Sequence, residues 1–531
     1  MKRKKVVLGD GDLDIAEFVA VVRDDAEVEL SQDYLARVSA SRLLVEKFLV
    51  ESRVVYGVTT GFGENVTKHV SPSDAWKLQQ NIVRSHAVSV GEPLEHELVR
   101  AIQLMILLSL GRGFSGVRRE VLELMAAMLN HRIIPFAPSE GSVGYLSVEA
   151  HMALVLMGEG QAWYEGHLLP GADALSAAGL SPLRFECKEG LALLNGTTSI
   201  TAIALLAAHT ALACCNVADV AAAISLQGLR GTVRAFDARY HSVKAHGQQR
   251  RTAAVLANLL KNSEIAAHNL DYRLQDAYCL RAVPQVHGAC RQAMLDAASS
   301  IELEMRSTGD NPIIVPVDGD GIAMSGANFD GTYVGIAADT LCIAMTNLAK
   351  ISERRTDRMV NPNLSGLPAF LVKAPGLNSG FMIAQYTAAG LVGDMRILSH
   401  PSSVDSIPTS GNQEDTICFA YSAAVKAYRA SRKLESVLAI ELMVGCQALD
   451  FLDPAQASPA THAVYELIRR VVSTVDEDRF FYPDIVAITR LIQTGEIAAA
   501  VSDVLGESLF SRDGPSPVTY SAPAIHARMN T

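Results

Sequence analysis

The stretch from Ile200 to Leu226 constrains the fold of this chain more than any other. It is built mostly from alanine, leucine and other apolar residues, and polar side chains at His209, Asn216 and Asp219 break it into shorter runs. A membrane span needs about 18 uninterrupted apolar residues, so these three positions argue against one. The stretch instead predicts a long helix buried in a protein core.

The composition fits a chain made of such helices. Hydrophobic residues make up 49% of the 531 positions, aromatic residues 6% and charged residues 19%. Alanine, leucine and valine carry most of the apolar content, which favours long packed helices over sheets. The length allows two to four domains of about 100–200 residues. The low charged fraction indicates that other subunits cover part of the surface.

Charge and cysteine usage argue against several classes of protein. The net charge of −11 disfavours nucleic acid as a partner, because phosphate binding needs a basic surface. The basic run at residues 2–5 is followed by acidic residues and by no apolar stretch, so we expect no signal peptide. The eight cysteines form no CxxC pair, which suits a reduced, cytoplasmic protein. No HExxH spacing occurs, and we expect no metal.

Apolar periodicity predicts helices along most of the chain. The expected helices are Leu13–Val22, Tyr34–Ser52, Trp76–Val90 with an interruption near His86, Val99–Leu110, Val117–Asn130, Val148–Met157, 331–355 and 432–452. Val54–Tyr56 is expected to form a short strand. The expected organisation is an N-terminal region over 1–200, a helix bundle over 201–510 and a loosely ordered tail over 511–531.

Three segments combine glycine or polar residues with apolar flanks. Pro138–Gly160 is a glycine-spaced turn leading into a buried helix, a pattern that an ordinary corner also has. Tyr56 lies at the edge of a glycine loop, where it is either a mobile catalytic residue or a tyrosine packed on a turn. Gln275, Tyr278 and Arg281 are spaced three apart, so a helix would place them on one face. Arg281 is then either a two-pronged carboxylate ligand or a surface arginine.

Many motifs occur along the chain in the order typical of one family, namely YGVTTGFG, RSHAVSVG, GSVG, AHMALVLMGEG, KEGLALLNGT, QDAYCLR, GANFDG, GLNSGFMIAQ and PTSGNQED. They resemble the aromatic amino acid ammonia-lyases and 2,3-aminomutases that carry a 4-methylidene-imidazol-5-one (MIO) group, and histidine ammonia-lyases in particular. The resemblance covers roughly residues 50–490. It implies a mainly α fold with a long central helix bundle, of the fumarase- and aspartase-like helical lyase architecture. It also implies a homotetramer with shared active sites.

The family makes its electrophile by cyclising an Ala-Ser-Gly triad, and this sequence departs from that pattern. Tyr145 follows Gly144 directly, although the segments on both sides match the family. Either the three residues are fused into one modified group that standard letters omit, or they are deleted and the chain is an inactive helical pseudoenzyme. We expect the first, because a deletion would hardly leave every neighbouring motif standing. The carbonyl carbon of Gly144 and the nitrogen of Tyr145 should then lie well beyond the ~1.33 Å of a peptide bond, with MIO between them.

The resemblance implies roles for the polar residues of these motifs. Tyr56 is the base that takes the β-proton of the substrate, and Arg281 binds its carboxylate. The residues expected to be catalytic are Tyr56, Asn195, Tyr278 and Arg281, with Gly144 and Tyr145 flanking the MIO group. Those expected to bind the substrate are His86, Gln275, Phe329, Gln413 and Glu414.

Two positions bear on the choice of substrate, an aromatic amino acid. His86 stands at the family's ring-selecting position, where histidine occurs with histidine or tyrosine substrates. Glu414 resembles the histidine-lyase version, in which a carboxylate binds an imidazole N–H. We therefore expect elimination of ammonia from L-histidine, which gives urocanate. Tyr145 stands where an acidic residue is usual, and it leaves open a tyrosine 2,3-aminomutase or tyrosine ammonia-lyase of a biosynthetic pathway.

Another all-helical lyase superfamily, that of fumarase and argininosuccinate lyase, is a weaker match. Its GSSxMPxKxNP loop has no clear counterpart in this sequence. The expected partners are thus a small aromatic amino acid and further copies of this chain, with no nucleic acid and no membrane.

Overall fold

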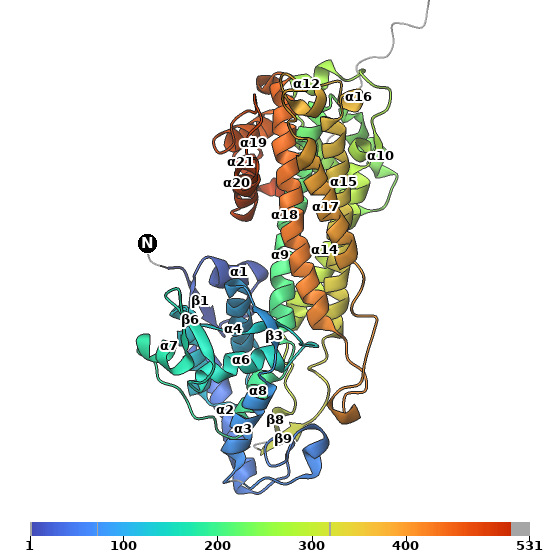
Figure 1. Ribbon diagram of the computed structural model, residues 1–531. Coiled ribbons are helices and arrows are strands. Elements are labelled where there is room, and N and C mark those ends of the chain that lie inside the picture. The colour runs from blue at the N-terminus through green and yellow to red at the C-terminus, as the bar shows by residue number, and fades with distance from the viewer. Residues whose placement is uncertain (1–2, 72, 318–319, 511–531) are drawn as a thin grey trace, which may run out of the picture. The chain divides into compact units, whose positions relative to one another are not determined.

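The structure is a computed structural model that describes residues 3–71, 73–317 and 320–510 (Figure 1). Most of the described residues are helical, which confirms the mainly α fold. The chain forms two compact units. Of the described residues, the first unit comprises those within 3–209, 297–339 and 401–428, and the second comprises those within 210–296, 340–400 and 429–510.

These two units do not correspond to the two continuous regions, 1–200 and 201–510, that the sequence predicts. The first break lies close to the expected boundary at residue 200, but the chain returns to the first unit twice, over 297–339 and 401–428. Sequence reasoning placed both segments in the helix bundle. The expected loose tail, 511–531, lies outside the described residues.

The first unit combines helices with several small sheets. Its helices are α1 (Ile15–Arg23), α2 (Gln32–Val50), α3 (Ala75–His86), α4 (His96–Leu110), α5 (Arg119–Asn130), α6 (Ser147–Leu156), α7 (Gly171–Ala177) and α8 (Glu189–Leu194). Its strands are β1 (Lys5–Leu8) parallel to β2 (Glu27–Leu30), β3 (Val90–Pro93) antiparallel to β5 (Pro138–Glu140), an antiparallel sheet in the order β4 (Ile134–Pro135), β6 (Gln161–Tyr164) and β7 (His167–Pro170), and the antiparallel pair β8 (Ile313–Val317) and β9 (Asp320–Met324).

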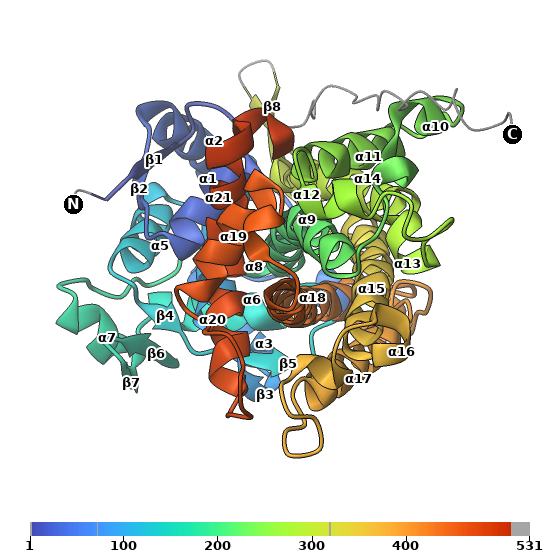
Figure 2. The same ribbon diagram turned by 90° about the horizontal axis from the view of Figure 1, so that it is seen from above.

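Long helices dominate the second unit. α9 (Thr198–Gly228), α14 (Val283–Met305), α15 (Thr332–Val360) and α18 (Ala420–Asp450) have residues in both units. In the second unit they run alongside one another and α17 (Met382–Leu398), as Figures 1 and 2 show. The shorter helices there are α10 (Ala238–Ser242), α11 (Gly247–Leu259), α12 (Glu264–His268), α13 (Tyr278–Arg281), α16 (Pro362–Ser365), α19 (Pro459–Arg469), α20 (Tyr482–Gln493) and α21 (Glu496–Leu505), with 3₁₀ turns η2 (Val233–Phe236), η3 (Ala369–Leu371), η5 (Pro454–Gln456) and η6 (Glu507–Phe510).

Helix α9 is the core helix that the apolar stretch predicts. Nearly all of its residues from Ile200 to Leu226 are buried. The segment Glu189–Gly228, which contains α9, and helix α15 are each long and apolar enough to cross a membrane, but 78% and 72% of their most apolar windows are buried inside this chain. The apolar content of α9 is therefore explained by packing within the chain, and it does not by itself require the other subunits that the composition suggested.

Local hydrogen bonds explain where the first helices begin. Asp14 and Glu17 form a reciprocal capping box at the start of α1, with Glu17 N donating to Asp14 Oδ1 at 2.8 Å. Ser31 Oγ accepts from Tyr34 N at 3.1 Å and begins α2. The predictions for Leu13–Val22 and Tyr34–Ser52 are thus confirmed to within a few residues.

Two local predictions are wrong. Val54–Tyr56 is not a strand, because Val55 N donates to Thr59 Oγ1 at 2.9 Å and Val55 O accepts from Val58 N at 3.1 Å. A turn thus satisfies backbone groups that a strand would pair. For the helix expected over Trp76–Val90, the interruption near His86 is confirmed because α3 ends there, but the helix does not resume, and Val90 already belongs to β3.

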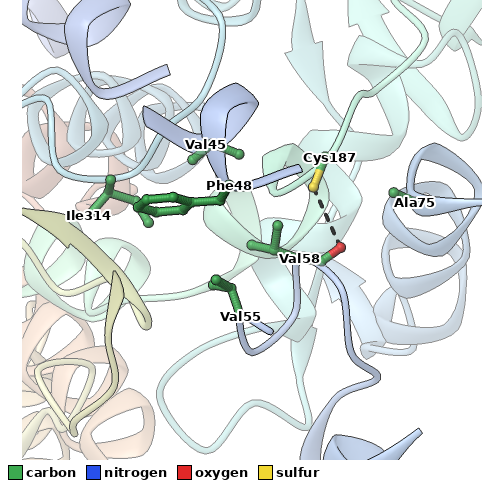
Figure 3. Close-up of a cluster of buried hydrophobic side chains, with 7 residues drawn as sticks. All are labelled: Val45, Phe48, Val55, Val58, Ala75, Cys187 and Ile314. Atoms are coloured by element: carbon green, nitrogen blue, oxygen red, sulfur yellow. Dashed lines mark hydrogen bonds between the residues drawn. The ribbon is translucent and has the colours of Figure 1, made fainter. Parts of the chain in front are cut away.

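A small hydrophobic core holds this turn in place. Figure 3 shows its buried members, Val45, Phe48, Val55, Val58, Ala75, Cys187 and Ile314. The thiol of Cys187 lies 3.5 Å from Val58 O. Since Val55 and Val58 lie on either side of Tyr56, their burial fixes the backbone from which that tyrosine projects.

Candidate active site

Tyr56 lies half-buried on the anchored turn. Its hydroxyl accepts a hydrogen bond from Gly63 N at 3.1 Å, and its ring meets Phe62 edge to face with centroids 6.4 Å apart. Gly57 has a φ of +65°, and a Cβ there would come within 2.4 Å of Leu191 Cδ2. Glycine is therefore required next to the tyrosine, and Tyr56 is held by its loop while its side chain remains partly accessible.

The loop between β5 and α6 makes a tight turn with backbone angles that are unusual for non-glycine residues. Gly144 has a φ of +152°, and Leu146 has φ +75° and ψ −63°. Ser147 N donates to Tyr145 O at 3.1 Å, which makes Leu146 the centre of a classic γ-turn, a conformation rare outside glycine. Such a conformation costs roughly 1–3 kcal/mol and is typical of functional sites. Gly144 and Tyr145 lie in one bend, and the wide separation expected between them stays a prediction.

Tyr145 connects this loop to two other predicted site residues. Its hydroxyl donates to Glu414 Oε2 at 2.9 Å, and its ring packs edge to face on Phe329 with centroids 5.3 Å apart. The side chain is 6% exposed. Burial, and then the neighbouring carboxylate of Glu414, raise the pKa of Tyr145. The phenol is therefore a hydrogen-bond donor at neutral pH.

The loop that carries Glu414 also contacts the loop of Tyr56. Gln413 Nε2 donates to Glu64 Oε2 at 3.1 Å, and Glu64 lies in the 3₁₀ turn η1 (Gly63–Thr67). A Cβ on Gly63 would come within 2.7 Å of Ser410 Oγ, in η4 (Ser410–Asn412). The structure therefore brings Tyr56, Tyr145, Phe329, Gln413 and Glu414 into one chain of contacts.

Asn195 joins the same assembly from the end of α8. Leu146 N donates to Leu194 O at 3.1 Å, which places the tight loop beside Asn195. The amide nitrogen of Asn195 donates to Asn311 O at 2.9 Å. The same nitrogen lies 3.4 Å from Asp310 Oδ1, and Asp310 Oδ2 pairs with Lys188 Nζ at 2.6 Å.

The buried Lys188–Asp310 pair was not identified as part of the site from the sequence. Lys188 is fully buried and Asp310 is 2% exposed. Lys188 begins the family motif KEGLALLNGT, and Asp310 begins a further family motif, DNP at 310–312, so these motifs were the available signal. What the sequence does not reveal is that two charges 122 positions apart meet beneath Asn195.

His86 is the last residue of α3 and lines a pocket of about 660 Å³ in the first unit. The pocket is also lined by Phe62, Gly63 and Ser410, so it adjoins the loops of Tyr56 and Glu414. His86 Nδ1 lies 3.0 Å from Ser85 Oγ, and burial lowers the pKa of the imidazole. A neutral imidazole at a pocket wall can donate to or accept from a polar ring.

Gln275, Tyr278 and Arg281 belong to the second unit. The expected single helix face is wrong in part, because α13 begins at Tyr278 and Gln275 precedes it in a bend. The three side chains nevertheless cluster. The guanidinium of Arg281 lies 5.1 Å from the Tyr278 ring centre, and the amide oxygen of Gln275, oriented toward it, lies 2.9 Å from Arg281 Nη2. Tyr278 is 69% exposed, so the cluster offers a cation and a phenol to a ligand.

Known proteins of one family match nearly the whole chain. The model of the aromatic amino acid lyase family matches residues 13–470. The histidine ammonia-lyase of Alkaliphilus oremlandii is 43% identical over 501 residues, which cover 94% of this chain and 98% of the relative. The crystal structure of histidine ammonia-lyase from Trypanosoma cruzi is 35% identical, with a TM-score of 0.88 and coverage of 95% of this chain and 96% of that one.

An aminomutase is equally close in structure. Tyrosine aminomutase from Streptomyces globisporus is 34% identical, with a TM-score of 0.89 and coverage of 94% of this chain and 98% of that one. These matches and the contiguous assembly of Tyr56, Tyr145, Asn195 and Glu414 agree with the motif-based resemblance. The chain belongs to the aromatic amino acid lyase family.

Proposed function

We propose that this protein is an ammonia-lyase that converts L-histidine to urocanate and ammonia. The observation that carries the proposal is the position of Glu414, whose carboxylate accepts from Thr409 and from Tyr145, and the ring of Tyr145 packs on Phe329. A carboxylate in a partly buried site favours a ring that donates an N–H, as imidazole does. The names of the relatives at 43% identity, histidine ammonia-lyases, support the same substrate.

The remaining site residues have separate roles in the elimination of ammonia. Tyr56, on its anchored loop, takes the β-proton, because its side chain is only half-buried and its hydroxyl is held by Gly63 N. Arg281 binds the substrate carboxylate through two parallel hydrogen bonds, with Gln275 and Tyr278 beside it. Asn195 provides amide contacts to the polar end of the substrate, and Lys188 and Asp310 hold that amide in place.

The proposal also includes the electrophile, the MIO group. A MIO group between Gly144 and Tyr145 would supply an electrophile for the substrate amine, which is a poor leaving group by itself. The residues present do not supply it, because no Ala-Ser-Gly stands between Gly144 and Tyr145. We infer that the three-residue group belongs at this junction, because the segments on both sides of it match the family pattern.

Intact-mass measurement tests the electrophile directly. The purified protein should be about 180 Da heavier than its 531 residues, which corresponds to Ala-Ser-Gly less two waters. Its near-ultraviolet absorbance should fall after treatment with borohydride. A mass equal to that of the 531 residues would establish the non-enzymatic alternative, a helical pseudoenzyme.

Product analysis tests the reaction. The protein is incubated separately with L-histidine, L-tyrosine and L-phenylalanine, and the products are separated and identified. Urocanate from histidine alone supports the proposal. β-Tyrosine or coumarate from tyrosine would contradict it in favour of the second candidate, an aminomutase or lyase acting on tyrosine, which the structural likeness to tyrosine aminomutase favours.

We further propose a cytoplasmic homotetramer. Ile383, Tyr386 and Ile397 on α17 are 56%, 62% and 75% exposed. Gly390 and Gly393 lie between them, and a Cβ at either would meet no atom within 4 Å. Small residues among exposed apolar ones form a helix face suited to close packing against another copy. Seven of the eight free cysteines are buried, which fits a reducing compartment. Light scattering coupled to size-exclusion chromatography tests the oligomeric state.

A further inference from the structure

The two oxygens of Glu414 have different surroundings. Oε2 accepts two hydrogen bonds, from Tyr145 Oη at 2.9 Å and from Thr409 Oγ1 at 2.9 Å. Within the described part of the chain, no donor bonds to Oε1. Glu414 is half-buried, so Oε1 is the oxygen left to accept a hydrogen bond from a ligand.

Backbone bonds fix the relation between Thr409 and Glu414. Thr409 N donates to Glu414 O at 2.8 Å, and Glu414 N donates to Thr409 O at 3.4 Å. The Thr409 hydroxyl is thus a local donor, supplied by the same loop. Tyr145 is a distant donor, 269 positions away in sequence. The rotation of the Glu414 carboxylate therefore depends on a contact that reaches across the site.

Tyr145 is itself well held. It is 6% exposed, its ring packs against Phe329, and the following residue, Leu146, is bonded to Leu194 O. An ionised phenolate would repel the carboxylate beside it, and the raised pKa of Tyr145 keeps the hydroxyl protonated. The residue thus acts as a donor with little freedom to turn away.

We propose that Tyr145 is a specificity-determining positioning residue, which holds Glu414 Oε2 so that Oε1 accepts the ring N–H of an imidazole substrate. This inference rests on the proposed histidine lyase function and deepens it. Tyr145 stands where the family pattern has an acidic residue, and this role explains that departure. An acidic residue at this position would repel Glu414, whereas the tyrosine stabilises it.

The proposal predicts different effects on the binding of substrates whose rings differ in hydrogen-bond donors. The imidazole of histidine donates an N–H to Glu414, whereas the phenyl ring of phenylalanine has no donor. Loss of the Tyr145 hydroxyl should therefore weaken the binding of histidine and leave that of phenylalanine unchanged. A residue that only fills space beside Phe329 would be replaced without effect by phenylalanine, which keeps the ring.

Calorimetric binding of L-histidine and L-phenylalanine to the full-length protein tests this role. Tyr145→Phe should weaken histidine binding roughly 10-fold, as expected when a hydrogen bond to a charged group is lost, and change phenylalanine binding by less than about twofold. Thr409→Val should weaken histidine binding in the same direction. The matched control is Tyr421→Phe, which removes another buried hydroxyl of the first unit, bonded to Ser139 O at 3.0 Å.

A double-mutant cycle distinguishes positioning from structure. In a Glu414→Gln background, Tyr145→Phe should have little further effect on histidine binding, because the charged carboxylate that it positions is gone. Absence of histidine binding by the unaltered protein would overturn the proposed substrate and this inference together. Histidine binding that Tyr145→Phe leaves unchanged would overturn the inference alone. Equal weakening of both ligands, with or without Glu414, would also overturn it, since Tyr145 would then be only structural.

Discussion

Side chains of the proposed site are positioned by neighbours that were not themselves predicted to be site residues. Asn195 illustrates this, since its amide is held by Asn311 O and by Asp310, and Asp310 is paired with the buried Lys188. A buried ion pair is tolerated only when its geometry and remaining hydrogen bonds are good. Here Asp310 Oδ1 also accepts from Asn195 Nδ2 and from Asn311 N, so the buried pair restrains Asn195, which is proposed to contact the substrate.

Tyr56 offers the sharpest prediction for a single residue. Tyr56→Phe should lower kcat for histidine by at least about 100-fold, because it removes the proton-accepting hydroxyl. Histidine binding should change little, since the ring contact with Phe62 remains. Urocanate absorbance gives the rate, and calorimetry gives the affinity. Tyr240→Phe, at a 64% exposed position in the second unit, is the control and should keep full activity. Equal turnover by both variants would refute the assignment.

The sequence identifies the residues of the site better than their connections. Tyr56, Asn195, Phe329 and Glu414 lie in motifs and are found together in the structure. The bond from Tyr145 to Glu414 could not be anticipated, because it joins residues far apart in the chain and departs from the family pattern. Periodicity carries no information on such long-range pairs.

Among the secondary-structure elements, helices are predicted more successfully than strands, because helices are long enough for a periodic pattern to be detected. Amphipathic periodicity accumulates over many turns, so α4, α5, α9 and α15 stand out. The strands span two to five residues, too few for an alternating pattern to emerge, and none of them was anticipated. Short helices share this weakness, as α13 shows by beginning three residues after Gln275.

Buried charge links three long helices of the second unit. Glu441 on α18 accepts from Ser225 of α9 at 2.6 Å, from Ser352 of α15 at 2.6 Å, and from Arg355 of α15 at 2.5 and 2.8 Å. Arg355 and Glu441 are both fully buried. The same carboxylate thus bonds to both helices.

Glu441→Gln should destabilise the protein strongly, because it leaves the Arg355 charge buried without its counter-charge. The expected loss in unfolding free energy is about 3–5 kcal/mol. Denaturant unfolding followed by circular dichroism measures it. The control is Asp394→Asn, which breaks the more exposed pair with Lys433 and should cost less than about 1 kcal/mol. Similar shifts in both variants would show that burial of the Arg355–Glu441 pair is not the decisive factor.

The buried carboxyl of Glu149, in the first turn of α6, predicts that the stability of the protein depends on pH. It is fully buried, accepts from Thr198 Oγ1 and Ser199 N at 3.0 Å, and its pKa is raised, chiefly by burial, above its ordinary value of 4.5. At pH below that value, both the folded and the unfolded state are protonated. As pH rises from there toward the raised pKa of the folded state, the unfolded state loses its proton first, so stability falls.

Glu149→Gln should therefore raise the thermal midpoint at pH 8 and change it much less near pH 4. The substitution mimics the protonated acid and removes the cost of ionising a buried group. Scanning calorimetry over this pH range measures the difference. Glu123→Gln, a surface residue of α5 paired with Arg119, is the control and should show no such trend. An equal or larger gain at low pH would contradict the burial argument.

For the whole molecule, the proposed site requires residues from both units. Tyr56 and Glu414 belong to the first unit, whereas Arg281 belongs to the second. Shared active sites, which the family resemblance implies, would draw them from different copies of the chain in the proposed homotetramer. Two variants, each lacking one of these residues, then carry complementary defects. This property distinguishes a shared site from one built by a single chain.

Complementation between Tyr56→Phe and Arg281→Ala tests this arrangement. Each variant alone should be nearly inactive, because every site lacks either the base or the carboxylate ligand. In equally mixed tetramers, produced by co-expression, about a quarter of the sites should combine an intact Tyr56 with an intact Arg281 from another copy, and activity should return to that level. Sites built within one chain would show no recovery, because no chain in the mixture carries both residues. Tyr56→Phe co-expressed with Glu414→Gln is the control: both residues lie in the first unit and are linked by its internal contacts, so this pair should remain inactive.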